Sequence, residues 1–257
     1  MHTSNSRRTL AFTATELLVV IVCVAVVFFF LLLPAEPTGK AKATRINCVN
    51  NLKNIGLAWR IYATDSEASY PWSRSGTNLP PCVPTNFVSV PGAPLSPAQG
   101  VAAIFGLITN ELSTPKILQC PSDTKRLQLK TNSFGLLLAP AQIAVRDRTI
   151  SYFIGTSARE EAPQSIMGGD RNLAGGPFSS DTNTPPSQVA LRIPLTVATN
   201  IAALKSAGWT KDIHQHAGNL LLGDGSVQQV TSGRMREQFR DAALTTDSDL
   251  DFVWPAN

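Results

Sequence analysis

The longest apolar run of the chain lies near its N-terminus, where residues 17–33 follow Glu16 without a single charged side chain. A helix of this length rises roughly 25 Å, which approaches the hydrocarbon thickness of a bilayer once flanking residues are included. The pattern therefore predicts a membrane-spanning helix over residues 12–33. Glu16 stands at its start, where a carboxylate beside hydrocarbon costs a few kcal/mol unless it finds a partner.

A second helix is predicted over residues 34–66. Pro34 and Pro37 interrupt helical hydrogen bonding, and the helix then resumes at about residue 41. Apolar residues recur there at steps of three or four, which places them on one stripe of a helix: Ile46, Val49, Leu52, Ile55, Trp59 and Tyr62. Together the two segments predict one long N-terminal spine.

Residues 67–257 are predicted to form a globular domain with a small antiparallel sheet. A stretch rich in proline, residues 70–96, comes first, and a short helix follows Ser96 and Pro97. Asp-Gly between two apolar runs is the strongest short-range indication of a hairpin, and Thr231 or Ser232 can cap a final helix. Strands are expected at 116–119, 149–154, 164–167, 189–197, 219–222 and 226–230.

Composition limits the range of functions. About 220 residues follow the first helix, which is enough for one domain with a hydrophobic core. Without Arg7 and Arg8, the 22 basic residues fall to 20 against 18 acidic ones, a formal charge of +2. This balance is not typical of a nucleic-acid-binding protein, so we expect no nucleic acid among the partners.

The first residues resemble a known processing signal. A short leader, residues 1–11, carries Arg7 and Arg8 and ends at Ala11, and Phe12 is followed four positions later by Glu16. The pattern resembles the N-terminal signal of type IV prepilins and type II secretion pseudopilins, although that family normally has Gly where this chain has Ala11. The resemblance implies that a prepilin peptidase cleaves between Ala11 and Phe12 and methylates Phe12. It also implies that Glu16 pairs with the N-terminus of a neighbouring subunit.

Three further motifs follow in the order seen in proteins with such a leader. They are an Asn-Cys-Val-Asn-Asn-Leu-Lys segment at 47–53, Cys-Pro-Ser-Asp at 120–123, and His-x9-Asp-Gly formed by His214, Asp224 and Gly225. The resemblance implies an α+β, pilin-like fold in which a long N-terminal membrane-spanning helical spine packs on a small antiparallel β-sheet.

The implied function is structural. The chain is expected to be a subunit of a type II secretion pseudopilus or type IV pilus-like filament. Its expected partners are prepilin peptidase, other subunits in a homo- or hetero-polymer, an inner-membrane assembly platform and membrane lipid. The implied location is the bacterial inner membrane, single-pass, with a cytoplasmic N-terminus and an extracytoplasmic C-terminal domain.

Other interpretations of the N-terminus remain. It can be an ordinary secretory signal or an uncleaved anchor, the second of which leaves Glu16 without a role. The alternative function is then a singly membrane-anchored extracytoplasmic domain that binds a ligand or metal and does not polymerise.

His214 is also a candidate metal ligand or catalytic residue. Asp212, His214, His216 and Asp224 offer nitrogen and oxygen ligands near one another, but a histidine beside a hairpin more often fixes the loop. A triad of Ser226, His214 and Asp224 lacks the Gly-x-Ser-x-Gly elbow, so we expect no enzyme and no catalytic residue.

The acidic residues and the cysteines suggest two further sites. Asp247, Asp249 and Asp251 alternate as at the start of a calcium loop, but the Gly and the terminal Glu of that loop are missing, so a solvated tail without a cofactor is expected. The resemblance to pseudopilins leaves a calcium ion at these three residues as the alternative. The spacing of a zinc site is absent. Cys48 and Cys120 recur in the family segments and are candidates for a disulfide, while pairing of either with Cys82 is equally open.

Overall fold

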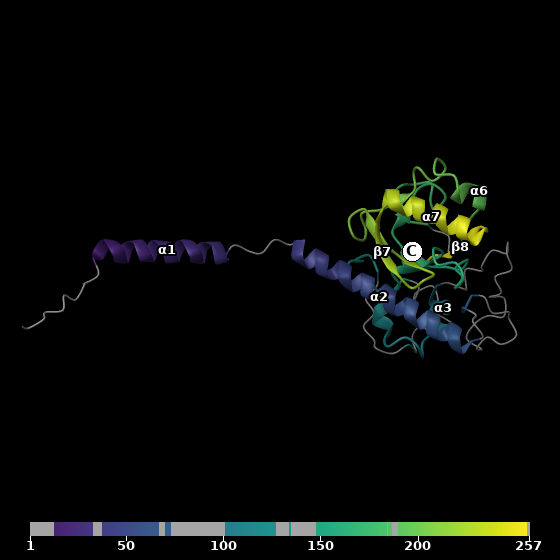
Figure 1. Cartoon of the computed structure of the whole chain (residues 1–257), viewed down its shortest axis with the longest axis horizontal. Helices are drawn as coiled ribbons and strands as arrows, with labels where there is room; N and C mark the ends of the chain where they lie inside the picture. The colour runs from purple at the N-terminus through teal and green to yellow at the C-terminus, as the bar shows by residue number, and fades with distance from the viewer. Residues whose placement is uncertain are drawn as a thin grey trace, which may run out of the picture. The chain divides into compact units, whose positions relative to one another are not determined.

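The computed structural model describes residues 13–32, 38–66, 70–72, 101–126, 134, 148–183, 185–186 and 190–255. The chain forms two compact units, Met1–Lys40 and Ala41–Asn257. The regular element of the first unit is helix α1 (Ala14–Leu32), labelled in Figure 1.

Helix α1 corrects the expected membrane-spanning spine. Its first turn contains Thr15 and Glu16, so its apolar part is residues 17–32, about 24 Å long, whereas a bilayer crossing takes about 20 apolar residues and 30 Å. Among the helices of the described residues, none combines the length and the apolarity that a crossing requires. The predictions of a transmembrane helix over 12–33, of a pilin-like fold built on it and of a single-pass inner-membrane location are therefore wrong.

The second unit is an α+β domain with a six-stranded antiparallel sheet, larger than the small sheet expected. The strand order is β4-β8-β1-β2-β6-β7, and β3 and β5 form a separate two-stranded ladder. The strands are β1 (Tyr152–Gly155), β2 (Ile166–Asp170), β3 (Leu173–Ala174), β4 (Ala190–Ile193), β5 (Gly208–Trp209), β6 (Ala217–Leu222), β7 (Val227–Thr231) and β8 (Leu250–Val253). The helices are α2 (Thr38–Asp65), α3 (Val101–Leu107), η1 (Pro115–Leu118), α6 (Leu195–Ala198) and α7 (Ser232–Thr246).

The sheet lies between α2 on one face and α7 on the other (Figure 1). Successive side chains of a strand point to opposite faces, and β1 follows this rule. Tyr152 and Ile154 belong to the core on the α2 side, while Phe153 belongs to the core on the α7 side. In β6, Leu221 faces α2 and Leu220 faces α7.

The apolar stripe of α2 is buried as predicted over most of its length. Leu52, Ile55 and Trp59 are at most 1 % exposed, whereas Ile46 lies on the open side and is 56 % exposed. A β-carbon added at Gly56 would lie 2.7 Å from Leu221 Cδ1, so a larger residue at this position would force the Leu221 side chain or the helix to shift.

Several local predictions are confirmed. The hairpin of β6 and β7 turns through residues 223–225, and Thr231 caps α7, whose apolar face is buried. Other predictions are wrong. Pro115–Leu118 forms a 3₁₀ helix that begins with Pro115 and is capped by the Thr114 side chain, which accepts from Lys116 N. The expected acidic tail contains β8, an interior strand between β4 and β1. Ser96, Pro97 and most of the proline-rich stretch lie outside the described residues.

Candidate functional site

Glu16 takes part in a capping box at the start of α1. Its Oε2 accepts hydrogen bonds from the Thr13 backbone N–H at 2.9 Å and from Thr13 Oγ1 at 2.8 Å, and Thr13 Oγ1 accepts from Glu16 N at 3.4 Å. This is the reciprocal arrangement of Ser/Thr-x-x-Glu sequences at helix starts. The bond from the Thr13 amide lowers the pKa of Glu16. The carboxylate is therefore ionised and already has local partners in a single chain.

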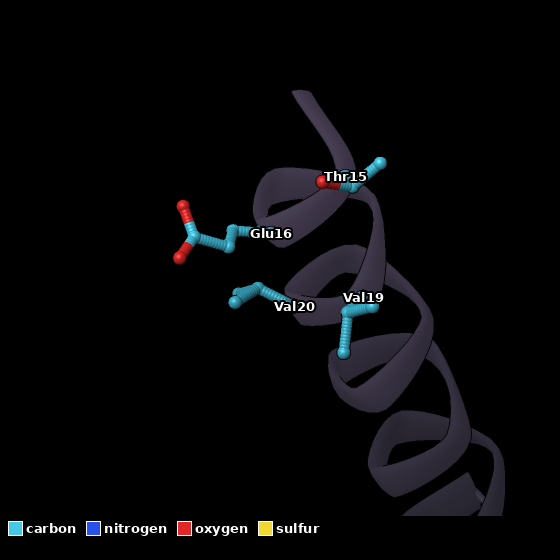
Figure 2. A pocket seen from close by; sticks show the side chains of 4 residues that line it. All are labelled: Thr15, Glu16, Val19 and Val20. Atoms are coloured by element: carbon cyan, nitrogen blue, oxygen red, sulfur yellow. The ribbon is translucent and has the colours of Figure 1, made fainter. Parts of the chain in front are cut away.

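The surroundings of Glu16 are apolar. Figure 2 shows its carboxylate directed away from the helix, with Val20 one turn further on the same side; Thr15, Glu16, Val19 and Val20 line a shallow hollow. The large apolar side chains of residues 17–29 are between 48 % and 67 % exposed. Ala11 and Phe12, the expected cleavage and methylation positions, lie outside the described residues.

A disulfide joins Cys48 of α2 to Cys120, which follows η1. Both residues are buried, and the bond links segments 72 positions apart in the sequence. It is one of the three pairings that the sequence left open. Cys82 lies outside the described residues, and Cys23 is exposed on α1 and takes no part in a disulfide.

His214 lies directly beside this disulfide. Its Nε2 is 3.6 Å from Cys120 Sγ and 3.5 Å from Asp170 Oδ2, and the whole residue is buried. Burial, together with the nearby cation of Arg45, lowers the pKa of His214 to about 4. The imidazole is therefore neutral at neutral pH, and its contact with Asp170 is not a full ion pair.

Asp170 ends strand β2 and is completely buried. Its Oδ2 accepts hydrogen bonds from Asn219 N at 2.8 Å and Asn219 Nδ2 at 2.9 Å. Its Oδ1 has no hydrogen-bond partner among the described residues. Burial raises the pKa of Asp170 to about 7, although both bonds from Asn219 act in the opposite direction. A buried acid and a buried imidazole thus lie in contact beside the disulfide.

The loop that carries His214 has an unusual backbone. His214, Gln215 and His216 all have positive φ values, of 56°, 53° and 64°. Each left-handed residue other than glycine costs roughly 1–2 kcal/mol, so the surrounding structure must hold this turn. Arg45 Nη2 donates to the His214 carbonyl at 2.7 Å, and Asn172 Nδ2 donates to the carbonyls of Thr210 and Ile213. These bonds fix the imidazole against the sulfurs.

The other half of the His-x9-Asp-Gly motif has a different role. Asp224 Oδ1 accepts from Ser226 N at 2.8 Å, its carbonyl accepts from Arg60 Nη1 at 2.9 Å, and Gly225 supplies a φ of 82°. His214 precedes β6 and Asp224 follows it, and a strand of six residues spans about 20 Å. His214 and Asp224 thus serve opposite ends of one strand.

Because of this separation, two sets of residues that the sequence suggested as sites do not come together. A triad of Ser226, His214 and Asp224 is not assembled in the structure, and neither is a metal site that uses both His214 and Asp224. Asp212 forms an ion pair with Lys125 at 2.7 Å, and His216 Nδ1 is 3.2 Å from the Trp209 carbonyl.

Two of the three acidic residues near the C-terminus, Asp249 and Asp251, also have protein partners. Asp251 forms a bidentate pair with Arg192 at 2.6 and 2.8 Å, Asp249 Oδ1 accepts from Leu195 N at 2.9 Å, and Asp247 ends α7 in the left-handed region. In the described part of the chain, the one group of three or more histidine, cysteine or acidic ligand atoms close enough to share an ion is Cys48, Cys120 and His214.

Asp170 and Arg45 are the residues of this site that the sequence did not identify. The available indication was an acid directly after a short buried strand, in Gly168-Gly169-Asp170. Its meaning depends on the pairing of β2 with β6, which brings Asn219 to Asp170.

Comparisons of this chain with protein-family models, with curated proteins and with solved structures found no match.

Proposed function

We propose that this chain is a structural subunit of a type II secretion pseudopilus or type IV pilus-like filament. It associates with other subunits through helix α1 after a prepilin peptidase removes residues 1–11. The proposal assigns no catalytic activity to the chain. The observation that carries it is the exposed apolar surface of α1, whose one charged residue is Glu16.

The exposure of α1 supports assembly with several neighbours. Residues 17–22 are consecutive, all apolar and all about half exposed or more, so they face every direction around the helix axis. Proteins that act alone rarely expose a continuous apolar surface of this kind, since burying it in contact with other subunits is favourable. A helix that is apolar all round suits the interior of a bundle rather than a single groove.

Glu16 fits such an assembly in one further respect. Its carboxylate points outward beside Val20 (Figure 2) and is ionised, so a neighbouring subunit can approach it with a cation. The resemblance to prepilins implies that this cation is the amine of Phe12 created by cleavage. In an interface that excludes water, such a pair is stronger than at a solvated surface.

Two substitutions separate the capping role of Glu16 from pairing between subunits. Glu16→Gln keeps a side chain that suits a capping box but removes the charge, whereas Thr13→Ala removes the cap and keeps the charge. We expect Glu16→Gln to lower the polymerised fraction of processed chain at least roughly tenfold, which corresponds to about 1.4 kcal/mol, and Thr13→Ala to lower it much less. Sedimentation and electron microscopy measure the fraction, and intact mass with N-terminal sequencing shows whether the chain begins at methylated Phe12.

The opposite ranking would overturn the role of Glu16 in assembly. If Thr13→Ala abolishes filaments and Glu16→Gln does not, the carboxylate acts as a helix cap alone. If the processed wild-type chain stays monomeric, the proposal of a filament subunit fails.

The cluster of Cys48, Cys120 and His214 favours a second candidate function, a ligand- or metal-binding domain that does not polymerise. That candidate predicts a monomer for the wild type, for Glu16→Gln and for Thr13→Ala alike. The same sedimentation experiment therefore distinguishes the two functions.

A further inference from the structure

The side chains around the Cys48–Cys120 disulfide have the composition of a metal site. Cys48 Sγ, Cys120 Sγ and a His214 ring nitrogen all lie within 4.8 Å of one another, and all three residues are buried. Asp170 Oδ2 lies 3.5 Å from His214 Nε2; it is not within 4.8 Å of all three of the other ligand atoms, so it becomes a fourth ligand only after a shift of the side chains. Two sulfurs, one imidazole and one carboxylate form a set that suits Zn²⁺.

We propose that the reduced form of this chain binds one Zn²⁺ ion through Cys48, Cys120, His214 and Asp170, and that disulfide formation and zinc binding exclude each other. The site is independent of helix α1 and of assembly, so it stands whether or not the chain polymerises.

Two of the six ligand separations already fit a tetrahedral ion. With Zn–S bonds of about 2.3 Å and Zn–N and Zn–O bonds of about 2.0–2.1 Å, tetrahedral angles place sulfur and nitrogen ligands about 3.6 Å apart, and nitrogen and oxygen ligands about 3.4 Å apart. The observed separations are 3.6 Å from Cys120 Sγ to His214 Nε2, and 3.5 Å from His214 Nε2 to Asp170 Oδ2. Two of the edges are therefore present in the oxidised protein.

A third edge of the tetrahedron, the one between the two sulfurs, requires the disulfide to be broken. Two zinc-bound sulfurs lie about 3.8 Å apart, which a covalent sulfur–sulfur bond forbids. A dithiol reductant supplies two electrons and two protons, converts the bond into two thiols and is itself oxidised to a disulfide. Zinc then binds both sulfurs as thiolates and their two protons pass to the solvent. An oxidant of the disulfide class reverses the reaction and releases the ion.

The surroundings already hold two of the ligands in place. Asn219 donates two hydrogen bonds to Asp170 Oδ2, and Arg45 fixes the carbonyl of His214. Such outer contacts orient metal ligands in known sites. The Oδ1 atom of Asp170, which is buried without a hydrogen-bond partner in the described part of the chain, gives the carboxylate one free oxygen for the ion.

Charge also favours a cation here. Two thiolates and one carboxylate carry three negative charges, so the site with Zn²⁺ has a net charge of −1. The Arg45 cation, which bonds the His214 carbonyl at 2.7 Å, balances that charge. In the oxidised protein the disulfide is neutral and offers no thiolate, so zinc loses its two strongest ligands.

The test measures zinc binding to the full chain in both redox states. The reduced protein, kept so by a phosphine, competes for Zn²⁺ with a chromophoric chelator, and we expect one tightly bound ion per reduced chain and none per oxidised chain. Co²⁺ as a probe should give thiolate charge-transfer absorption in the reduced wild type. Replacing both cysteines, Cys48→Ser with Cys120→Ser, should remove the absorption and the binding.

Matched variants identify the other ligands. We expect His214→Ala to weaken zinc binding by more than the roughly 10–100-fold that loss of an outer contact causes. His216→Ala is the control, because His216 shares the left-handed loop but not the cluster, and it should bind zinc as the wild type does. Asp170→Asn should also lower the affinity; wild-type affinity in that variant would overturn the assignment of Asp170.

Circular dichroism shows whether the reduced chain is folded, and this determines how a lack of zinc binding is interpreted. If the reduced chain is folded and binds no zinc, the proposal is wrong. If the reduced chain is unfolded, added zinc should restore the fold. Failure of zinc to restore it would also contradict the proposal. Equal weakening by His214→Ala and His216→Ala would show that the loop, and not the imidazole, controls binding.

Discussion

Both faces of the six-stranded sheet bury aromatic rings, among them Trp59, Trp72 and Phe105 on the α2 side, but they differ in the ionisable groups buried beside those rings. On the α7 side, five aromatic rings stack or meet edge to face with centroids 4.4–6.1 Å apart: Phe153, Phe178, Phe239, Phe252 and Trp254. On the α2 side, the chain buries its ionisable groups near the disulfide: Asp123, Arg126, Asp170, Arg171 and His214.

The α7 side mainly stabilises the fold, whereas the α2 side also holds buried groups that can titrate or bind a ligand. Apolar rings gain free energy from burial alone, whereas a buried charge requires a partner, such as the two 2.7 Å bonds between Arg171 and Asp123. A face that tolerates this cost close to sulfur and imidazole ligands is the face on which a site is expected. Mutations on the α7 side should therefore act through packing alone, whereas the α2 side should respond to packing and also to pH, redox state and metal.

The largest effect is expected on the α7 side from Phe239→Ala. Phe239 is fully buried, with its ring 5.3 Å from Phe178 and 5.4 Å from Phe252. Removing the ring leaves a cavity and should lower the free energy of unfolding by about 3–5 kcal/mol. Denaturant titration measures the change. Leu244→Ala in the same helix, at a position 60 % exposed, should change it by less than about 0.5 kcal/mol, and similar losses in both would show that burial of the Phe239 ring is not what stabilises the α7 side.

A smaller effect, and one that depends on pH, is expected on the α2 side of the oxidised, metal-free protein. The pKa of Asp170 rises on folding from 3.8 to about 7, so its contribution to stability falls as pH rises from about 4 to 7. The pKa of His214 falls on folding from 6.5 to about 4, so its contribution is lost as pH decreases through that window. The two slopes oppose each other in the wild type.

Single substitutions should reveal each slope. Relative to the wild type, Asp170→Asn leaves the His214 effect, so its stability should rise between pH 4 and 6.5 by about 3 kcal/mol more. His214→Asn, chosen because Asn tolerates positive φ, should shift the slope in the opposite direction. Denaturant titrations at several pH values give both curves. Curves that run parallel to the wild type would show that neither group titrates as its burial implies.

The sequence predicted the elements that local patterns determine. The Asp-Gly turn, the Thr231 cap of α7 and the buried stripe of α2 each depend on residues within a few positions of one another. β8 was missed because its acidic surroundings hide Leu250, Phe252 and Val253, and its partners β4 and β1 lie about 60 and 100 residues earlier. The prediction of a membrane-spanning spine was wrong because it counted flanking residues toward the bilayer thickness, whereas the apolar part of α1, residues 17–32, is about 24 Å long.

The candidate site shows the same limit. A motif identified His214, but it also coupled that residue to Asp224, which lies beyond the other end of β6. Asp170 was missed because its contact with His214 depends on the register of β2 with β1 and β6. Side chains that meet through sheet register carry no fixed spacing in the sequence, so a rule based on the spacing of zinc ligands did not find this cluster.

The smallest effect concerns the start of α7 and compares two Thr→Ala changes in one helix. Thr231 Oγ1 accepts a hydrogen bond from Arg234 N at 3.4 Å, so Thr231→Ala should lower the free energy of unfolding by about 1 kcal/mol. Thr245 lies exposed in the last turn, where its hydroxyl bonds the Asp241 carbonyl, and alanine suits a helix at least as well there. Thr245→Ala should therefore be neutral or slightly stabilising in the same denaturant titration. Equal losses would mean that the capping bond contributes nothing and that α7 is held by its buried aromatic face alone.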